Sequence, residues 1–462
     1  MDRLPIELLH LIVESLSTSS RAALARTCRR YYGILQPHVY ANVFLNHSCA
    51  KASFFKSVLQ RPHLALAVRS LHLDSWETHN VEIRSEEVTT RLGDAWGVDL
   101  FRKLVSDDPR FKDDAEEWFS GLDSFNEDAF VALSMPRFTN LKRLGIEYPY
   151  GCDFFNRLMM TTKYESASAF GSDAAARVAD MFPCLEELHI AWYDTENAIS
   201  AHMAVPFFSI TTLRKVSGNS VAGGSSDDAN TSPPAEGKTR FSGVTEIDLA
   251  NSHAGDAGLS VWLNLCHGLK SFRYAHGGAT VSWDDFAPAA FATTLAPHRH
   301  TLERLWIEVD EGIDLDNVEG RLGSAFAEYS ALKILCITLA ILLENPDGNN
   351  SATTQLADAV PRSLEVLVLV DSNDDWIVSQ VEHLLRVNRC PRLKLLVLEW
   401  YGAPEWKEKL HTVRELCEEA GVQLRFRSGK YMAEVWPWYS IPGVEMEPMD
   451  WNVDGEEEAV VL

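Results

Sequence analysis

The stretch SLEVLVLV, residues 363–370, decides the fold of this chain because it carries leucine at fixed intervals, at Leu364, Leu367 and Leu369. Two residues separate the first pair of leucines and one residue separates the second pair. The same frame of leucine or isoleucine returns at Leu141-Leu144-Ile146, Leu185-Leu188-Ile190, Leu302-Leu305-Ile307, Leu332-Leu335-Ile337 and Leu393-Leu396-Leu398. Looser copies occur at Val68-Leu71-Leu73, Val244-Ile247-Leu249 and Leu269-Phe272-Tyr274. A frame that recurs in this way indicates a chain built from structural repeats.

The spacing of the copies indicates the type of repeat. From Leu188 to Leu424 the middle positions of successive copies lie about 25–33 residues apart, slightly longer than the usual ~20–29 of leucine-rich repeats. Each copy predicts one short strand with inward apolar side chains and a connecting helix on the outer side. No copy buries its apolar face alone, whereas stacked copies bury a continuous core. The sequence therefore predicts an α/β fold, a leucine-rich-repeat solenoid with a curved parallel sheet inside and helices outside.

A doubly wound α/β fold is the alternative to a solenoid. It also alternates buried strands with helices, and therefore shares the general pattern of apolar runs. The recurrence of the whole leucine frame, rather than of apolar runs alone, favours the solenoid.

The balance of charge limits the classes of partner. The 462 residues contain 66 Asp and Glu against 42 Lys and Arg, a net charge of −24. Such an excess of acid argues against nucleic acid or an anionic membrane as a partner. Residues 1–45 differ, because five Arg against three acidic residues give them a charge of +2, while 37 basic against 63 acidic residues give the rest −26.

The cysteines and the apolar runs indicate the compartment. The eight Cys form no C-x-x-C pair and are typical of reduced, small hydrophobic residues in an intracellular protein. No apolar run approaches the ~18 residues of a membrane-spanning helix. Glu7, His10 and Glu14 interrupt the N-terminal apolar run that a secretory signal would need. We therefore expect a cytoplasmic or nuclear protein that is not secreted.

Residues 1–45 have the pattern of a small helical module. Pro5 suits a first helical turn, and Leu8, Leu9, Ile12 and Leu16 follow at helical spacing, which assigns them to one face. A second helix is predicted after a cap at Ser19 or Ser20 and ends at Pro37, with the apolar residues Leu24, Cys28, Tyr31 or Tyr32, and Leu35. About 40 residues are too few for a secure core. Their apolar face therefore needs cover, either from the first repeat, which they would cap, or from another protein.

This module resembles an F-box of the kind common in fungal proteins. The resemblance covers about residues 3–45 and rests on Leu4-Pro5-x-Glu7-Leu8 with Ile12 and Leu16, then Leu24-Ala25-x-x-Cys28-Arg29-x-x-Tyr32 and Pro37-x-x-Tyr40. One departure is Tyr31-Tyr32, where many members have Trp or Leu. An F-box followed by leucine-rich repeats is the layout of a known family, the fungal-type F-box proteins with leucine-rich repeats.

The resemblance implies a function and a set of site residues. In that family the F-box binds the small Skp-type adaptor of a cullin–RING ubiquitin ligase of the SCF type, and the repeats hold the protein substrate. The implied adaptor-binding residues are Leu4, Pro5, Leu8, Leu9, Ile12, Leu16, Leu24 and Cys28. A repeat scaffold whose N-terminal helices only cap the solenoid is the main alternative, and an enzyme with a degenerate site is a third.

The rest of the chain divides by composition. A linking helix is predicted over residues 46–66 and the repeats over 67–428. The repeats contain an acidic insertion near 74–130, with helical segments around 95–106 and 113–134. Residues 217–240, rich in Gly, Ser, Asp and Pro, predict an exposed, flexible loop. Residues 429–462 form an aromatic and then acidic tail.

Catalytic and cofactor motifs are incomplete in this sequence. Gly237-Lys238-Thr239 lacks the glycine of a phosphate-binding loop, because Ser232 stands in its place. We find no constellation of residues for a nucleophile, a metal or a cofactor, and we expect no enzyme activity.

The repeats predict a binding surface on the concave face, where side chains alternate with the inward ones. We assign the following residues to substrate binding there: Glu147, His189, Asp248, Arg273, Trp306 and Glu308. The later strands present apolar side chains such as Val368 and Val397 on the same face, which is typical of a covered or binding surface. Either a substrate docks there, or the aromatic tail around Trp436 folds back and covers it; we favour the second.

Overall fold

The leucine frame forms parallel strands whose framing side chains are buried. The structure is a computed structural model that describes residues 5–78, 93–159, 172–194, 197–223, 242–253, 256–277, 286–309, 320–343, 354–370, 376–399 and 407–427. In the stretch quoted above, Val366–Val370 forms strand β12, and Leu364, Leu367 and Leu369 are 0% exposed. The predicted α/β class, a parallel sheet with helices packed on it, is confirmed.

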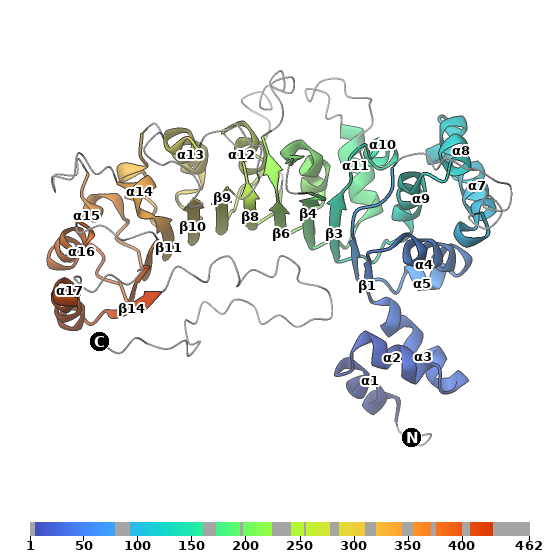
Figure 1. Ribbon diagram of the computed structural model, residues 1–462, viewed down its shortest axis with the longest axis horizontal. Coiled ribbons are helices and arrows are strands. Elements are labelled where there is room, and N and C mark those ends of the chain that lie inside the picture. The colour runs from blue at the N-terminus through green and yellow to red at the C-terminus, as the bar shows by residue number, and fades with distance from the viewer. Residues whose placement is uncertain are drawn as a thin grey trace. The chain divides into compact units, whose positions relative to one another are not determined.

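The chain divides into two units. Of the described residues, unit one holds those up to Tyr193 and Met203–Arg214, and unit two holds Asp194–His202 and those from Lys215 to Arg427. The elements of each unit are described separately below, with the labels of Figure 1.

Unit one begins with three helices and continues as a four-stranded parallel part of the sheet. The opening helices are α1 (Ile6–Glu14), α2 (Thr18–Ala25) and α3 (Arg29–Tyr40). The strands, in order, are β1 (Asn42–Leu45), β2 (Ser70–Leu73), β3 (Arg143–Tyr148) and β4 (Glu187–Trp192). The helices between and after the strands are α4 (Ser48–Gln60), α5 (Pro62–Ala65), α7 (Val98–Asp107), α8 (Ala115–Asp123), α9 (Glu127–Ser134), α10 (Asp153–Met159) and α11 (Ser172–Met181), with 3-10 turns at Pro109–Phe111, Met135–Arg137 and Ala201–Ser209.

Unit two contains an eight-stranded parallel run. Its strands, in order, are β6 (Lys215–Asn219), β8 (Glu246–Ser252), β9 (Ser271–His276), β10 (Arg304–Val309), β11 (Ile334–Thr338), β12, β13 (Leu395–Glu399) and β14 (Gln423–Arg427). A separate pair joins β5 (Ile199–Ser200) to β7 (Val221–Ala222). The helices are α12 (Asp256–Leu263), α13 (Pro288–Leu295), α14 (Leu339–Leu342), α15 (Leu356–Ala359), α16 (Trp376–Arg386) and α17 (Lys407–Ala420), with 3-10 turns at Ala296–His298 and Gly323–Phe326.

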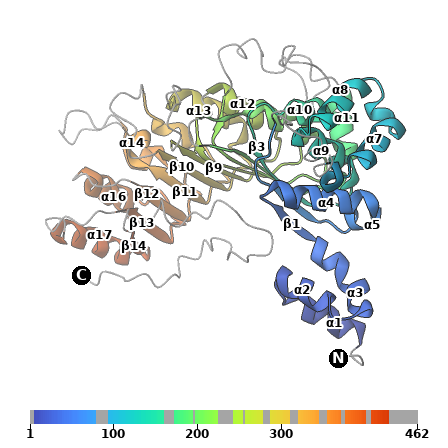
Figure 2. The same cartoon turned by 45° about the vertical axis from the view of Figure 1, so that its right-hand side comes forward.

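The frame sets the register between neighbouring strands. Leu305 lies opposite Leu335, Leu335 opposite Leu367, and Leu367 opposite Leu396, so that equivalent positions of successive repeats align. The alternate side chains of each strand point to the other side of the sheet. In unit two the helices lie on one side of the strands (Figures 1 and 2). We call the opposite side, which carries the alternate side chains, the strand face.

The acidic insertion of unit one is anchored by one buried carboxylate. The Asp128 side chain is 0% exposed and accepts hydrogen bonds from Trp76 Nε1 (3.1 Å), Phe154 N (2.6 Å) and Phe155 N (3.3 Å). These bonds join α9 to the chain after β2 and to the first turn of α10, whose backbone N–H groups have no partner within the helix. Lys51 of α4, also buried, donates to the carbonyl oxygen of Ser75 (2.6 Å) and lies 3.8 Å from Glu127.

The elements differ from several sequence predictions. The second helix of the opening module is two helices, because Cys28 adopts an extended conformation between α2 and α3 and its sulfur accepts from Tyr31 N. The side chain of Ser17, rather than Ser19 or Ser20, caps α2, and α3 continues through Pro37 to Tyr40.

The predicted boundaries of the middle segments also shift. Residues 46–66 contain two helices, α4 and α5, instead of one. Phe54 and Phe55 of α4 are buried, so this segment packs as part of the repeats. Residues 113–134 contain α8 and α9 instead of one helix. The first residues of the predicted loop 217–240 belong to β6 and β7, whereas residues 224–240 and the tail 429–462 lie outside the described residues.

Candidate protein-binding surfaces

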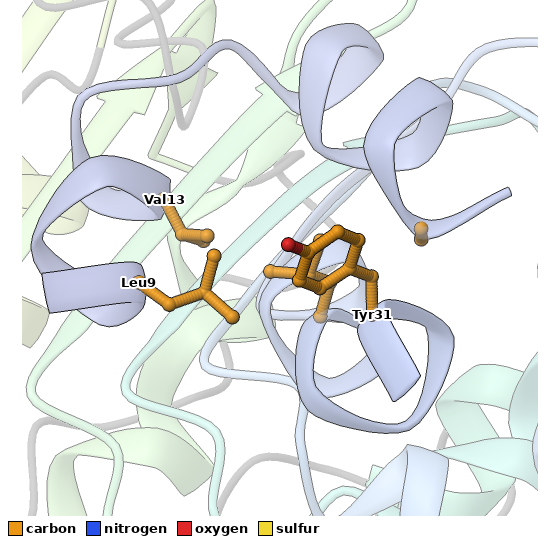
Figure 3. Packing of buried hydrophobic residues seen from close by; sticks show 5 residues of the cluster. Leu9, Val13 and Tyr31 are labelled. Atoms are coloured by element: carbon orange, nitrogen blue, oxygen red, sulfur yellow. The ribbon is translucent and has the colours of Figure 1, made fainter. Parts of the chain in front are cut away.

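The opening module has a small core of its own. Leu9 and Val13 of α1, 2% and 0% exposed, point toward Tyr31 of α3 (Figure 3), and Ala25 and Leu35 complete the buried cluster. Leu9 and Val13 are four residues apart and so lie on one stripe of the helix. This stripe holds α1 against α2 and α3.

Two polar contacts fix α1 in the module. Arg21 of α2 donates from Nε to the carbonyl oxygen of Val13 (2.8 Å), near the C-terminal end of α1. His10 Nδ1 and His38 Nε2 of α3 lie 2.9 Å apart and share a hydrogen bond. The orientation of α1 about its own axis is therefore defined by contacts on both sides of Leu9.

The other side of α1 is apolar and open. Ile6, Leu8, Leu11 and Ile12 are 46%, 47%, 63% and 39% exposed. Leu8, Leu11 and Ile12 follow the i, i+3, i+4 spacing of a second stripe. A helix that is apolar nearly all round is normally buried. The second stripe of α1 therefore has the character of a contact surface, which we call the α1 outer face.

The sequence-predicted adaptor residues are divided between the two sides. Leu8 and Ile12 lie on the α1 outer face, and Pro5, exposed, caps the helix start. The half-buried residues are Leu16, Leu24 and Cys28. Leu4 lies outside the described residues.

Leu9 corrects the sequence prediction. It was assigned to the same face as Leu8, but neighbouring residues of a helix are about 100° apart, and Leu9 is a core residue. Sequence reasoning also missed Ile6 and Leu11. Their signal was present in the same run, because Leu11 continues the stripe of Leu8, but both stripes were read as one.

The strand face of unit two brings four predicted substrate residues together. Arg273 of β9 lies between Asp248 of β8 and Glu308 of β10, with nitrogen–oxygen distances of 3.5 Å and 3.9 Å. Its guanidinium carbon lies 5.2 Å from the ring centroid of Trp306 on β10. The register explains this grouping, because Asp248 pairs with Arg273 and Arg273 pairs with Trp306 across adjacent strands. Asp248 is the most open of the charged side chains, 36% exposed against 11% for Arg273 and 13% for Glu308.

The other two predicted substrate residues, Glu147 and His189, are half-buried alternate residues of β3 and β4 in unit one, and we call the side of those strands that they share the strand face of unit one. The ring of His189 stacks on the ring of His72, with the two ring centroids 6.4 Å apart. The His72 ring also stacks on the ring of Phe44, at a centroid separation of 5.0 Å. Gly145 lies between His72 and His189 in the strand register. A Cβ atom at position 145 would collide with the His72 ring, so the glycine leaves the space that this ring occupies.

The carboxyl of Glu147 neighbours Asp74 on the same face. Burial raises the pKa of Glu147 above its usual range, and a hydrogen bond with the Asp74 carboxyl raises it further. Burial also lowers the pKa of His72, although Asp74, 3.8 Å away, opposes this effect. The raised pKa of Glu147 favours its protonated form, which can donate a hydrogen bond to the Asp74 carboxyl close to the His72 ring.

Burial keeps two of the cysteine thiols protonated. All eight cysteines are free, and burial raises the pKa of Cys390 and of Cys417 to about 11, so both thiols stay protonated at neutral pH. In the part of the chain that the structure describes, no three His, Cys, Asp or Glu side chains gather as metal ligands would. Residues 237–239 lie outside that part. None of the described helices is both long and apolar enough to cross a membrane.

Comparison with known families agrees with this arrangement. A family model described as F-box-like matches residues 1–46, which include α1, α2, α3 and β1. A second model, described as a leucine-rich repeat domain, matches residues 48–392, most of the chain. A search of curated proteins finds no match to the chain. The boundary between the two matches falls directly after β1, the edge strand of unit one.

Proposed function

The chain belongs to the F-box proteins with leucine-rich repeats, and on that premise we propose that it is the substrate-recognition subunit of a cullin–RING ubiquitin ligase of the SCF type. Its F-box would bind a Skp-type adaptor and thereby the ligase core. Its repeats would hold a protein target. The chain itself would catalyse nothing, because ubiquitin transfer belongs to other subunits of such a ligase.

The α1 outer face is the observation that carries this proposal. Its four apolar side chains are each about half exposed, although the module has its own closed core. Full burial of an aliphatic side chain contributes roughly 2–3 kcal/mol, so covering what remains open contributes about 1 kcal/mol for each residue. Four such residues provide about 4 kcal/mol of favourable burial to a partner with a complementary apolar groove.

The target surface in this proposal is the strand face. The Asp248–Arg273–Glu308 group offers charged contacts from three adjacent strands, with Asp248 the most open of them, while the buried Trp306 ring supports Arg273 from below. Rigid sheet positions hold these side chains in fixed geometry, as a recognition surface requires. Glu147 and His189 provide hydrogen-bonding groups on the strand face of unit one.

An end-capping role for the module is the second candidate, and one observation favours it in part. The last residues of the F-box match form β1, which pairs with β2 from Asn42↔Ser70 to Leu45↔Leu73. This strand covers the edge of the sheet, as an end cap does. Capping accounts for β1, but it leaves the α1 outer face without a role.

Binding to a purified Skp-type adaptor tests the proposal. The full chain should form a stable complex on size-exclusion chromatography, and Leu8→Asp with Ile12→Asp should abolish it, because both charges would be buried in the interface. The matched control is Leu66→Asp with Val387→Asp, two residues of similar exposure (47% and 49%) away from α1. This control should bind like the unaltered chain.

Two results would decide against the ligase role. If the unaltered chain does not bind the adaptor, or if the α1 double variant binds as well as the control, the α1 outer face is not an adaptor site. Unfolding of the repeats in the α1 double variant, with the control intact, would instead support the capping role.

A further inference from the structure

The strand face of unit two contains an apolar zone on three neighbouring strands. In register across β11, β12 and β13 lie Ile334, Val366 and Leu395, and next to them Cys336, Val368 and Val397. Ile334, Val366, Val368, Val370 and Leu395 are half-buried rather than closed. A sheet face that meets water normally carries polar side chains, as β8, β9 and β10 do in the same unit. The zone is therefore suited to cover by another segment.

An arginine borders this apolar zone at β14, because Arg425 lies opposite Val397 in register. On the other side lie Trp306, opposite Cys336, and Arg273, which stacks on Trp306 and is paired with Asp248 and Glu308. A segment that matches the zone needs apolar or aromatic side chains in the middle and carboxylates next to them.

One segment with this chemistry is part of the same chain. Residues 428–462 follow β14 directly and contain Trp436, Trp438 and Tyr439 with Pro437 and Pro442. Residues 443–462 then contain seven acidic residues and no Lys or Arg. We propose that residues 436–442 dock on the apolar zone of β11–β13 and that the acidic residues after them pair with Arg425 at its border.

The chain is long enough for this contact. Neighbouring strands lie about 4.8 Å apart, so β11 is about 15 Å from β14. The eight residues 428–435 span up to about 27 Å when extended. Trp436 can therefore reach any of the three strands, and the short connection gives the segment a high effective concentration at the zone.

The contact would regulate the surface that the proposed function assigns to the target. The segment would compete with a target for the apolar zone, and a target that displaces it would share its chemistry, aromatic residues followed by acids. This consequence rests on the proposed function, whereas the contact itself does not involve the adaptor.

A labelled peptide tests the contact in the full chain. The peptide carries residues 431–450, and its binding is measured by fluorescence anisotropy to two proteins, the unaltered chain and the variant Trp436→Ser/Trp438→Ser/Tyr439→Ser. The peptide should bind the triple variant at least tenfold more tightly, because in the unaltered chain its own segment competes. Adding Val368→Glu to the triple variant should weaken binding at least tenfold, while Val387→Glu, at an exposed position of similar size outside the zone, should not.

Each other result overturns the inference. Equal affinity for the two proteins means that the chain's own segment does not occupy the zone and leaves it to a foreign partner. Absence of binding to the triple variant, or equal effects of Val368→Glu and Val387→Glu, means that the zone is not the site. Circular dichroism melting checks that Val368→Glu folds, and Val366→Glu replaces it if it does not. All measurements omit the adaptor, so their failure leaves the adaptor test unaffected.

Discussion

Replacing Leu8 and Leu9 by alanine, one at a time, separates the two faces of α1. The residues are neighbours in sequence and identical in chemistry, but Leu9 is 2% exposed in the module core and Leu8 is 47% exposed. Removing a buried leucine side chain costs about 3 kcal/mol, since a cavity remains. Removing an exposed one changes stability by less than about 0.5 kcal/mol. Leu9→Ala should therefore destabilise the module and Leu8→Ala should not.

The effects on adaptor binding should be reversed. About half of the Leu8 side chain is still open in the free chain, so a partner that covers it gains about 1 kcal/mol, half of the roughly 2–3 kcal/mol of full burial. Leu8→Ala should thus weaken the adaptor complex about fivefold. Leu9→Ala should leave the affinity nearly unchanged wherever the module remains folded.

Two assays read the two effects. Hydrogen exchange of the α1 amides in increasing urea reports the stability of the module, and calorimetric titration reports the adaptor affinity. Equal destabilisation by the two substitutions would refute the division of α1 into an inner and an outer stripe. Unchanged affinity of Leu8→Ala would remove Leu8 from the interface.

Three further predictions concern the repeats. Asp128→Ala should destabilise unit one by about 3 kcal/mol, because three N–H donors, two of them fully buried, lose their acceptor; urea unfolding measures this, and a change below about 1 kcal/mol would contradict the anchoring role. Burial, with a smaller effect from His253, lowers the pKa of His276 to about 4. Since the unfolded imidazole titrates near 6.5, stability should fall by about 3 kcal/mol as the pH drops from 6.5 to 4, and His276→Gln should flatten this slope in pH-dependent melting. The pKa of Glu147 is raised, so its protonated form is favoured in the folded state and stability is lost as the pH rises above the ordinary carboxyl range; Glu147→Gln should remove that loss, and an unchanged pH profile would count against the protonated form.

The strands could be predicted from sequence because one pattern fixes both burial and register. In copies such as Leu302-Leu305-Ile307 each framing residue is at most 1% exposed, and stacking identical frames leaves one alignment of neighbouring strands. In a weaker copy, Leu213-Val216-Gly218, the sequence indicates the middle position but not the end of the strand. Gly218 stands at a framing position because a Cβ there would meet Val221 and Leu249, and its missing side chain made β6 resemble the start of a loop.

The surfaces were less predictable than the strands. The charged group around Arg273 followed from counting alternate residues along strands, because parallel register places equivalent positions side by side. The α1 stripes did not follow, because Leu8 and Leu9 are chemically alike and only the packing of α1 on Tyr31 decides which of them faces inward. Strand β1 was missed since Asn42–Leu45 has no leucine frame and depends on its pairing with β2.

Radical footprinting of the α1 side chains, with and without the adaptor, measures the central claim most directly. Hydroxyl radicals modify aliphatic side chains in proportion to their contact with water, so Leu8, Leu11 and Ile12 should react in the free chain and Leu9 and Val13 should not. In the adaptor complex the three outer residues should become protected while the inner pair stays unchanged. Outer residues that are already protected in the free chain, or that remain reactive in the complex, would contradict an open helix face built for a partner.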